Sequence, residues 1–262
     1  MFTTQHLVFL ACMIVLIAVS LILLKKFKPS EKTVFTIATV ICLLSEFAKI
    51  YAVTRMLPMA DGSGYVPFFE RRELPLHLCS IQIFFILYIR FFAKEGEKKQ
   101  KILGFMFPSM ILGSFFALLL PSVFNVVPVE KAFTSLQVYQ TFIYHAMLMV
   151  LGIYIYVKHF SEWKTKNYLY TLGLLFGFSV ASIYVNSLLA YLTFDSEHQY
   201  ASIEKMSNFF FVVKTPIGIP LNEKWQWLIY IIILIVLAFI LVGAFYIPAF
   251  RRDLKERNAL KK

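Results

Sequence analysis

The sequence predicts an all-α membrane protein: a seven-transmembrane-helix bundle forming one domain over residues 1–262, with its N-terminus outside and its C-terminus cytoplasmic. Two observations lead to this prediction. The chain is 59% hydrophobic, and its apolar residues gather in seven runs. Each run has roughly the 20 residues that a helix needs to cross a bilayer. The loops between the runs alternate in charge, as the two sides of a membrane require.

The apolar runs can be taken in order. We interpret the first as a retained helix, because it lacks the basic segment that opens a signal peptide. The third begins at Pro75, which suits the first turn of a helix because no amide donor is lost there. Pro108 lies inside the fourth and predicts a kink. The seven predicted spans cover residues 6–24, 33–57, 75–93, 101–120, 134–158, 167–194 and 226–248.

The basic residues indicate orientation rather than nucleic-acid binding. The formal net charge is +11, but the bases cluster beside the apolar runs, with no basic patch interleaved with aromatic residues. The first, third and fifth loops and the C-terminal tail are net positive, whereas the even-numbered loops are not. The positive-inside rule then places the odd-numbered loops in the cytoplasm. A composition rich in Lys, Ile and Phe and poor in Gly favours a bacterial protein, hence a bacterial plasma membrane.

Polar side chains on four of the predicted spans fall at similar depths in the outer half of the bilayer. At a rise of about 1.5 Å per residue, Cys79 lies roughly 6 Å below the outer end of its span and His145 roughly 16 Å below that of its own. Polar side chains in a membrane face the bundle interior and mark functional sites. We therefore expect one polar cavity, open outward or to the outer leaflet, lined by Glu46, Lys49, His77, Cys79, Gln82, Gln140, Tyr144, His145, Tyr184 and Asn186.

Cys79 has the setting of a nucleophile. A thiol at a helix start lies where the helix macrodipole favours thiolate. His77 is two residues away, roughly 200° around a regular helix, so it shares no target atom with Cys79 unless the helix starts late. His145, on another span, is the better base. Simpler interpretations stay open: Cys79 as a small apolar residue, His77 as a helix cap, and Glu46–Lys49 as a buried ion pair.

Three stretches carry a resemblance to a known family. The sequence LPLHLC, from Leu74 to Cys79, resembles the PLHxC signature of the YwaF-like integral membrane proteins, which are related to the eukaryotic transmembrane protein 164 acyltransferases. The stretch 208–216 resembles their Asn-Tyr-rich segment followed by Lys-x-Pro, with Asn208 matching and Phe209 replacing the usual Tyr. The stretch 224–230 resembles the tryptophan-rich start of their last span.

The resemblance covers essentially the whole chain and implies a seven-helix bundle. It also implies cysteine-dependent transfer of fatty acyl groups between glycerophospholipids, with Cys79 as the nucleophile and His145 as its partner. Amides at the start of the third helix, with Gln140 or Asn208, would stabilise the oxyanion.

We therefore expect an integral membrane acyltransferase that takes an acyl group from a phospholipid and gives it to a lysophospholipid. Arg71, Arg72 or Lys49 would hold a phosphate. The sequence shows no motif for a metal or a nucleotide cofactor, and it leaves the oligomeric state open. Two alternatives remain: a lipid hydrolase that uses the same cysteine and histidine with water, and a transporter or channel whose polar path includes Glu46, Lys49 and His145. A receptor-like or structural role is a third.

Overall fold

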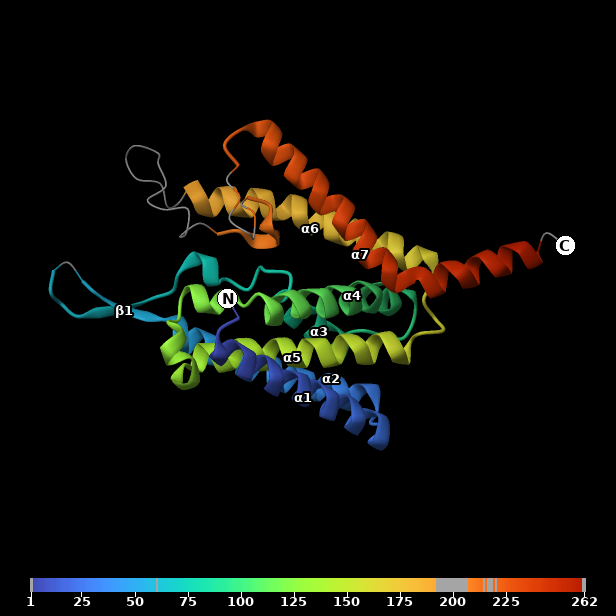
Figure 1. Cartoon of the computed structure of the whole chain (residues 1–262), viewed down its shortest axis with the longest axis horizontal. Coiled ribbons are helices and arrows are strands. Elements are labelled where there is room, and N and C mark those ends of the chain that lie inside the picture. The colour runs from blue at the N-terminus through green and yellow to red at the C-terminus, as the bar shows by residue number, and fades with distance from the viewer. Residues whose placement is uncertain are drawn as a thin grey trace.

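The computed structural model describes residues 2–59, 61–191, 207–213, 215, 219 and 221–260. Long helices dominate this part of the chain, and Figure 1 shows them running along a common axis. The α-helices are α1 (Thr4–Phe27), α2 (Glu31–Val53), α3 (Gln82–Phe91), α4 (Glu97–Leu119), α5 (Leu136–Lys158), α6 (Thr165–Tyr191) and α7 (Lys224–Ala259). The smaller elements are β1 (Arg55–Pro58), β2 (Tyr65–Phe68) and the 3-10 helices η1 (Arg71–Glu73), η2 (Ser122–Asn125), η3 (Val129–Thr134) and η5 (Phe209–Phe211).

The predicted all-α membrane architecture is confirmed in its main features. Six of the described helices are long and apolar enough to cross a membrane, and α3 is apolar but only 10 residues long. The chain is therefore built as an integral membrane protein with six or seven spans. Figure 1 places the N-terminus and the C-terminus at opposite ends of the molecule. Which end faces outside stays a prediction.

The second predicted span, 33–57, is wrong at its outer end. Helix α2 stops at Val53, and the chain then forms an antiparallel hairpin in which Arg55 pairs with Phe68. Gly62 and Gly64 in the turn have φ of 71° and 147°, values that glycine adopts without steric cost. Figure 1 shows this hairpin projecting away from the helices. Both strands are exposed along their whole length, so the apolar side chains here do not extend the bundle core.

Helix α4 is the centre of the bundle. In the most apolar 18-residue stretch of α4, 56% of residues are buried, against 6% in that of α7. Helix α4 packs against both α5 and α6. Figure 1 shows it between α6 and α7 on one side and α5, α1 and α2 on the other. Its interior Pro108 has no N–H for the carbonyl of Gly104, four residues earlier. The buried hydroxyl of Tyr246 from α7 donates to that carbonyl instead, at 2.9 Å, and the helix continues unbroken.

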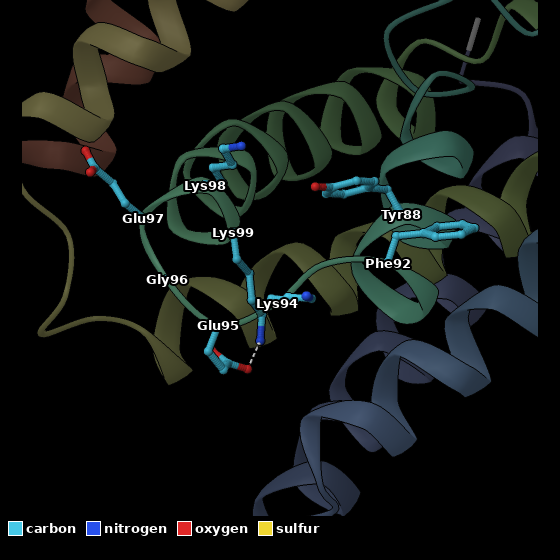
Figure 2. Close-up of a pocket in the computed structure, with 8 residues that line it drawn as sticks. All are labelled: Tyr88, Phe92, Lys94, Glu95, Gly96, Glu97, Lys98 and Lys99. Atoms are coloured by element: carbon cyan, nitrogen blue, oxygen red, sulfur yellow. Dashed lines mark hydrogen bonds and ion pairs between the residues drawn. The ribbon is translucent and has the colours of Figure 1, made fainter.

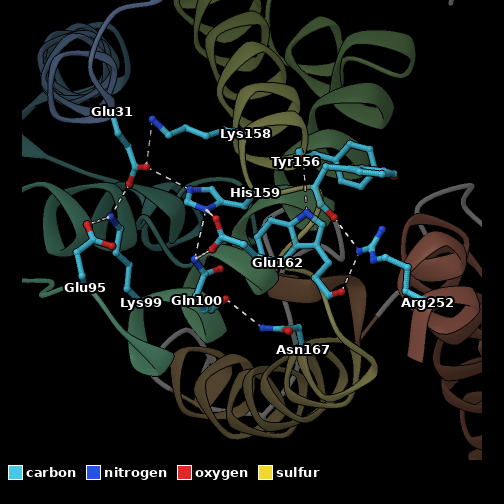
Figure 3. A network of polar contacts seen from close by, with 12 residues as sticks. Glu31, Glu95, Lys99, Gln100, Tyr156, Lys158, His159, Glu162, Asn167 and Arg252 are labelled. Atoms are coloured by element: carbon cyan, nitrogen blue, oxygen red, sulfur yellow. Dashed lines mark hydrogen bonds and ion pairs between the residues drawn. The ribbon is translucent and has the colours of Figure 1, made fainter. Parts of the chain in front are cut away.

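Ion pairs close the basic end of the bundle, where α2, α4 and α5 meet (Figure 3). Nζ of Lys99 lies 2.6 Å from carboxylate oxygens of both Glu31 and Glu95. His159, just after α5, lies between two carboxylates: its Nε2 is 3.2 Å from Glu31 and its Nδ1 is 3.1 Å from Glu162. A ring that donates from both nitrogens is the protonated imidazolium.

The charge on His159 follows from its surroundings. Burial lowers its pKa, but the hydrogen bonds and charges of Glu31 and Glu162 outweigh burial, so the pKa of His159 is raised above its ordinary value. His159 thus joins α5 to the start of α2, in surroundings that favour its charged form.

Candidate functional site

The segment that carries Cys79 precedes α3 instead of forming its first turn. The third predicted span, 75–93, is therefore wrong at its start, since the helix begins at Gln82. Side chains take up carbonyl groups that a continuous helix would use. Nε2 of Gln82 donates to the carbonyl of Leu78 at 3.2 Å, and the hydroxyl of Tyr144 on α5 donates to the carbonyl of Cys79 at 2.8 Å. These bonds hold the cysteine in a turn between α4 and α5.

The thiol of Cys79 lies directly against the backbone of α4. A Cβ atom added at Gly113 would stand 2.8 Å from Sγ, closer than such atoms approach in real proteins. Only glycine at position 113 accommodates the sulfur where it is. The side chain is partly buried rather than enclosed, in contrast to the fully buried Cys42. The thiol is therefore packed against α4, in a residue that is not fully enclosed.

The turn leaves backbone donors unused beside the thiol. The amides of Ile81 and Gln82 are hydrogen-bonded to the carbonyls of His77 and Cys79. The amides of Cys79 and Ser80 donate to no acceptor within the described residues. Unused N–H groups next to a nucleophile are the donors from which oxyanion holes are built.

His145 is held by its own helix in a form suited to proton transfer. Its Nδ1 lies 2.7 Å from the carbonyl of Thr141, one turn earlier. Because a carbonyl only accepts, we assign the ring proton to Nδ1, which leaves Nε2 of the neutral ring with its lone pair. His145 follows Tyr144, whose hydroxyl reaches Cys79. No hydrogen bond joins Sγ of Cys79 to His145 in the described structure.

His77 points to a different neighbour from Cys79, although α3 starts late and the helical spacing does not apply to this turn. Its ring meets that of Phe209 edge-to-face, with centroids 4.8 Å apart, while the thiol faces Gly113. The ring also lies beside the backbone of Arg72 and within electrostatic range of Lys49 and His145. The structure thus brings both histidines to the neighbourhood of the cysteine, from the turn before α3 and from α5.

The two predicted glutamines connect helices. Nε2 of Gln82 donates to Ser109 of α4 at 2.9 Å, and Nε2 of Gln140 donates to Ser45 of α2 at 2.8 Å. Hydrogen bonds of this kind hold transmembrane helices together. The amide donor that we expected from Gln140 at an oxyanion is engaged at Ser45 in this structure.

The ion pair expected between Glu46 and Lys49 is present, at 2.8 Å. Nζ of Lys49 also donates to the carbonyl of Glu73 at 3.1 Å, which ties η1 to α2. Of the predicted phosphate ligands, Lys49 and Arg72 therefore pair with carboxylates of this chain, Arg72 with Glu70 at 2.7 Å. Arg71 is exposed and forms no ion pair within the described residues.

Asn186 and Asn208 shape the segment that covers His77. The side chain of Asn186 on α6 holds the backbone of Phe209 at both ends, accepting from its N–H at 3.0 Å and donating to its carbonyl at 3.1 Å. Oδ1 of Asn208 accepts from the amide of Val213 at 3.0 Å. Both asparagines thus position Phe209 over His77. The remainder of the matching stretch, Lys214 and Pro216, lies outside the described residues.

Tyr184 does not line the site. The prediction that it faces the bundle interior is wrong, because its side chain is 73% exposed on α6. Counting residues from the end of a span gives the depth of a side chain. The direction in which it points depends on how α6 packs, and here Ser182 and Asn186 take the buried face.

Sequence reasoning missed several residues that hold the site. Gly113, Ser45, Ser109 and the carbonyl of Glu73 each contact a predicted site residue from another element. Small residues at helix contacts are the usual signal, but only the fold says which one faces the thiol. Among the described residues, no group of three His, Cys, Asp or Glu side chains is placed to hold a metal ion.

Comparison with known proteins identifies the family of the chain. The model of the TMEM164 family matches residues 1–246. The chain belongs to the TMEM164 family. The match takes in every element from α1 to α6 and most of α7, so the candidate site lies within the matched part of the chain. No curated protein and no solved structure matches the chain.

Proposed function

We propose that this member of the TMEM164 family is a phospholipid acyltransferase that works through a thioester on Cys79, in a bacterial plasma membrane. The donor is a phospholipid and the acceptor a lysophospholipid. One observation carries the proposal: the thiol of the partly buried Cys79 lies against α4, and Tyr144, the neighbour of His145 in α5, is hydrogen-bonded to the backbone of the same cysteine. Acyl transfer needs a nucleophile and a base on separate, rigid supports.

In the first step the thiol attacks the ester carbonyl of the donor. Nε2 of His145 takes the thiol proton as the carbon–sulfur bond forms, and the carbonyl oxygen becomes an oxyanion. The carbon–oxygen bond to the glycerol then breaks, and the imidazolium returns the proton to the departing glycerol oxygen. The products are an acyl thioester on Cys79 and a lysophospholipid. The two side chains meet only when the donor is bound, since catalytic hydrogen bonds often tighten in the substrate complex.

The second step reverses the first with a new alcohol. The hydroxyl of the acceptor lysophospholipid gives its proton to Nε2 of His145 and attacks the thioester carbon. The carbon–sulfur bond breaks, and the thiolate recovers the proton from the imidazolium. A new phospholipid leaves, and the protein returns to its starting state.

The unused amides of Cys79 and Ser80 support the oxyanion role. In this mechanism they donate to the oxyanion in both steps, because the attacked carbonyl stands next to the sulfur. They replace Gln140, whose amide is engaged by Ser45. For the donor phosphate, Arg71 is the better ligand, because Lys49 and Arg72 already have carboxylate partners.

The test uses purified protein in mixed micelles, with a phospholipid labelled in one acyl chain and an unlabelled lysophospholipid. Wild-type protein should produce labelled diacyl product from the lysophospholipid, and Cys79→Ala should produce none. Cys12→Ala and Cys42→Ala are matched controls, because they remove the other thiols and should leave transfer intact. Equal transfer by wild type and Cys79→Ala would refute the covalent mechanism.

Two alternatives give different results, the first in the same assay and the second in proteoliposomes. A hydrolase would release labelled fatty acid at a rate that lysophospholipid does not change. A transporter would show flux in proteoliposomes that survives Cys79→Ser and collapses with Glu46→Gln, since its path would depend on the Glu46–Lys49 pair. The geometry favours acyl transfer over transport, because Glu46 and Lys49 pair with each other and Lys49 also holds η1 to α2.

A further inference from the structure

A second polar feature lies at the other end of α3 from the cysteine. Tyr88 and Phe92 at the end of α3, with residues 94–99 at the start of α4, line an open hollow (Figure 2). The 10 residues of α3 separate it from the turn that carries Cys79, a length of roughly 15 Å at the helical rise. The hollow is thus distinct from the proposed active site.

The lining of the hollow carries three lysines and two glutamates. Glu95 pairs with Lys99 at 2.6 Å, and Lys99 also pairs with Glu31 of α2. Glu97 pairs with Lys101 and Lys166, each at 3.2 Å. Both acidic residues of the hollow therefore already have lysine partners, Glu95 within the hollow and Glu97 outside it.

Two lysines remain without a carboxylate. Lys94 and Lys98 are exposed and form no ion pair within the described residues. Both lysines line the hollow together with Tyr88. In Figure 2 the Lys98 side chain and the Tyr88 hydroxyl extend toward each other, and Lys94 lies nearer Phe92. Two ammonium groups and a phenol that line one hollow form a site for a group with negative charge and several acceptor oxygens, such as a phosphate.

The wall next to these charges is apolar. The side chain of Phe92 is 73% exposed and that of Phe84, two turns earlier on α3, is 53% exposed. A hydrocarbon chain lying along α3 would cover both rings, while a phosphate at the end of the helix met the lysines. A free anion would use only the charged half of the surface. A phospholipid uses both halves.

We propose that this hollow binds the phosphate of an anionic phospholipid in the leaflet at the basic end of the bundle, with Lys94 and Lys98 as ligands and Tyr88 as hydrogen-bond donor. The bound lipid is not a substrate, because α3 separates it from Cys79. It anchors the α3–α4 turn to the membrane surface, where basic pockets between helices bind anionic head groups.

The test is native mass spectrometry of the full chain in detergent, titrated with phosphatidylglycerol, phosphatidylcholine or inorganic phosphate. Wild type should retain phosphatidylglycerol in preference to phosphatidylcholine. The double variant Lys94→Gln/Lys98→Gln should weaken that retention by roughly tenfold, since each lysine near an anionic lipid contributes several-fold. Lys25→Gln/Lys26→Gln removes the same charge from the exposed end of α1 and should change retention less than twofold.

Three results would overturn the proposal. The Lys94/Lys98 variant retaining phosphatidylglycerol as wild type does would remove the lysines from the site. Equal retention of phosphatidylcholine would show that charge plays no part, and displacement of the lipid by inorganic phosphate at similar concentration would make it a free-anion site. Cys79→Ala should bind phosphatidylglycerol as wild type does, so failure of the acyl-transfer mechanism leaves this test intact.

Discussion

Histidines at the two ends of the bundle have opposite surroundings. At the basic end, His159 lies between the carboxylates of Glu31 and Glu162, which raise its pKa and favour its charged form. Farther toward the other end, His145 has a backbone carbonyl as its partner and no carboxylate within hydrogen-bond distance in the described structure. A paired imidazolium is a structural link, because its protons are already committed. An unpaired neutral imidazole with Nε2 open is free to move protons.

Replacing His145 should therefore have the largest effect of any histidine change. His145→Gln removes the proposed base, and general base catalysis contributes about 10²–10⁴-fold. Transfer of labelled acyl chains should fall by that factor, while His159→Gln should stay close to wild type in activity. The measurement is the transfer rate of each variant, on protein shown by size exclusion to be folded. A loss of activity with His159→Gln equal to that of His145→Gln would erase the distinction between the two ends.

A smaller effect is expected from Gly113→Ala. The added Cβ would stand 2.8 Å from Sγ of Cys79, so the thiol must move away from its packed position. A displacement of this kind costs roughly 10–10²-fold in rate, because small errors in placement weaken attack strongly. Gly177→Ala is the control, because a Cβ there meets no atom within 4 Å. Unchanged transfer by Gly113→Ala would show that the sulfur does not act from this position.

Tyr144→Phe should have a more modest effect. The hydroxyl donates to the carbonyl of Cys79, and a hydrogen bond of this type is worth about 1 kcal/mol, or several-fold in rate if it positions the turn. Tyr154→Phe on the same helix is a matched control, since that buried hydroxyl has no hydrogen-bond partner within the described residues. A drop in transfer that is equal for both variants would assign the effect to general destabilisation of α5.

The smallest effect concerns pH and stability at the basic end. His159 has a raised pKa in the folded protein, so its stabilisation is fully present below its unfolded pKa of about 6.5 and is lost as pH rises through the folded value. Glu31 and Glu162 face the ring, and Lys99 and Lys158 pair with Glu31 around it. Melting between pH 6 and 9 should show wild type losing roughly 2–4 °C.

His159→Gln should remove most of this pH dependence, because the neutral amide does not titrate. Acyl transfer measured on the same samples is the companion readout, and it should not follow the melting curve. A pH dependence of melting that persists in His159→Gln would place the titrating group elsewhere.

The long helices could be predicted from the sequence, because an apolar run of bilayer length is a strong signal. The predicted spans 101–120 and 134–158 lie within a few residues of α4 and α5. The late start of α3 could not be predicted in this way. It depends on Tyr144, which reaches Cys79 across 65 positions in the sequence, and on the side chain of Gln82 turning back to Leu78.

For the candidate site, the sequence indicates how deep in the membrane a side chain lies, and it says less about the direction in which that side chain points. Of the residues that counting along spans grouped at one depth, the structure pairs Glu46 with Lys49 and hydrogen-bonds Tyr144 to the backbone of Cys79. The same counting placed Tyr184 there, although its side chain points outward. Direction around a helix depends on which neighbours it packs against, and a single sequence contains no record of them. The contact between Gly113 and the thiol of Cys79 also depends on how the helices pack, so the sequence did not reveal it.

The most direct test of acyl transfer through Cys79 is to trap the intermediate. Protein is incubated with a labelled donor phospholipid without acceptor, denatured in acid, digested, and analysed by mass spectrometry with and without hydroxylamine. A thioester mechanism predicts an acyl mass on the peptide containing Cys79, removed by hydroxylamine and lost in Cys79→Ala. No acyl group on that peptide, in a preparation that transfers acyl chains to lysophospholipid at full rate, would contradict it.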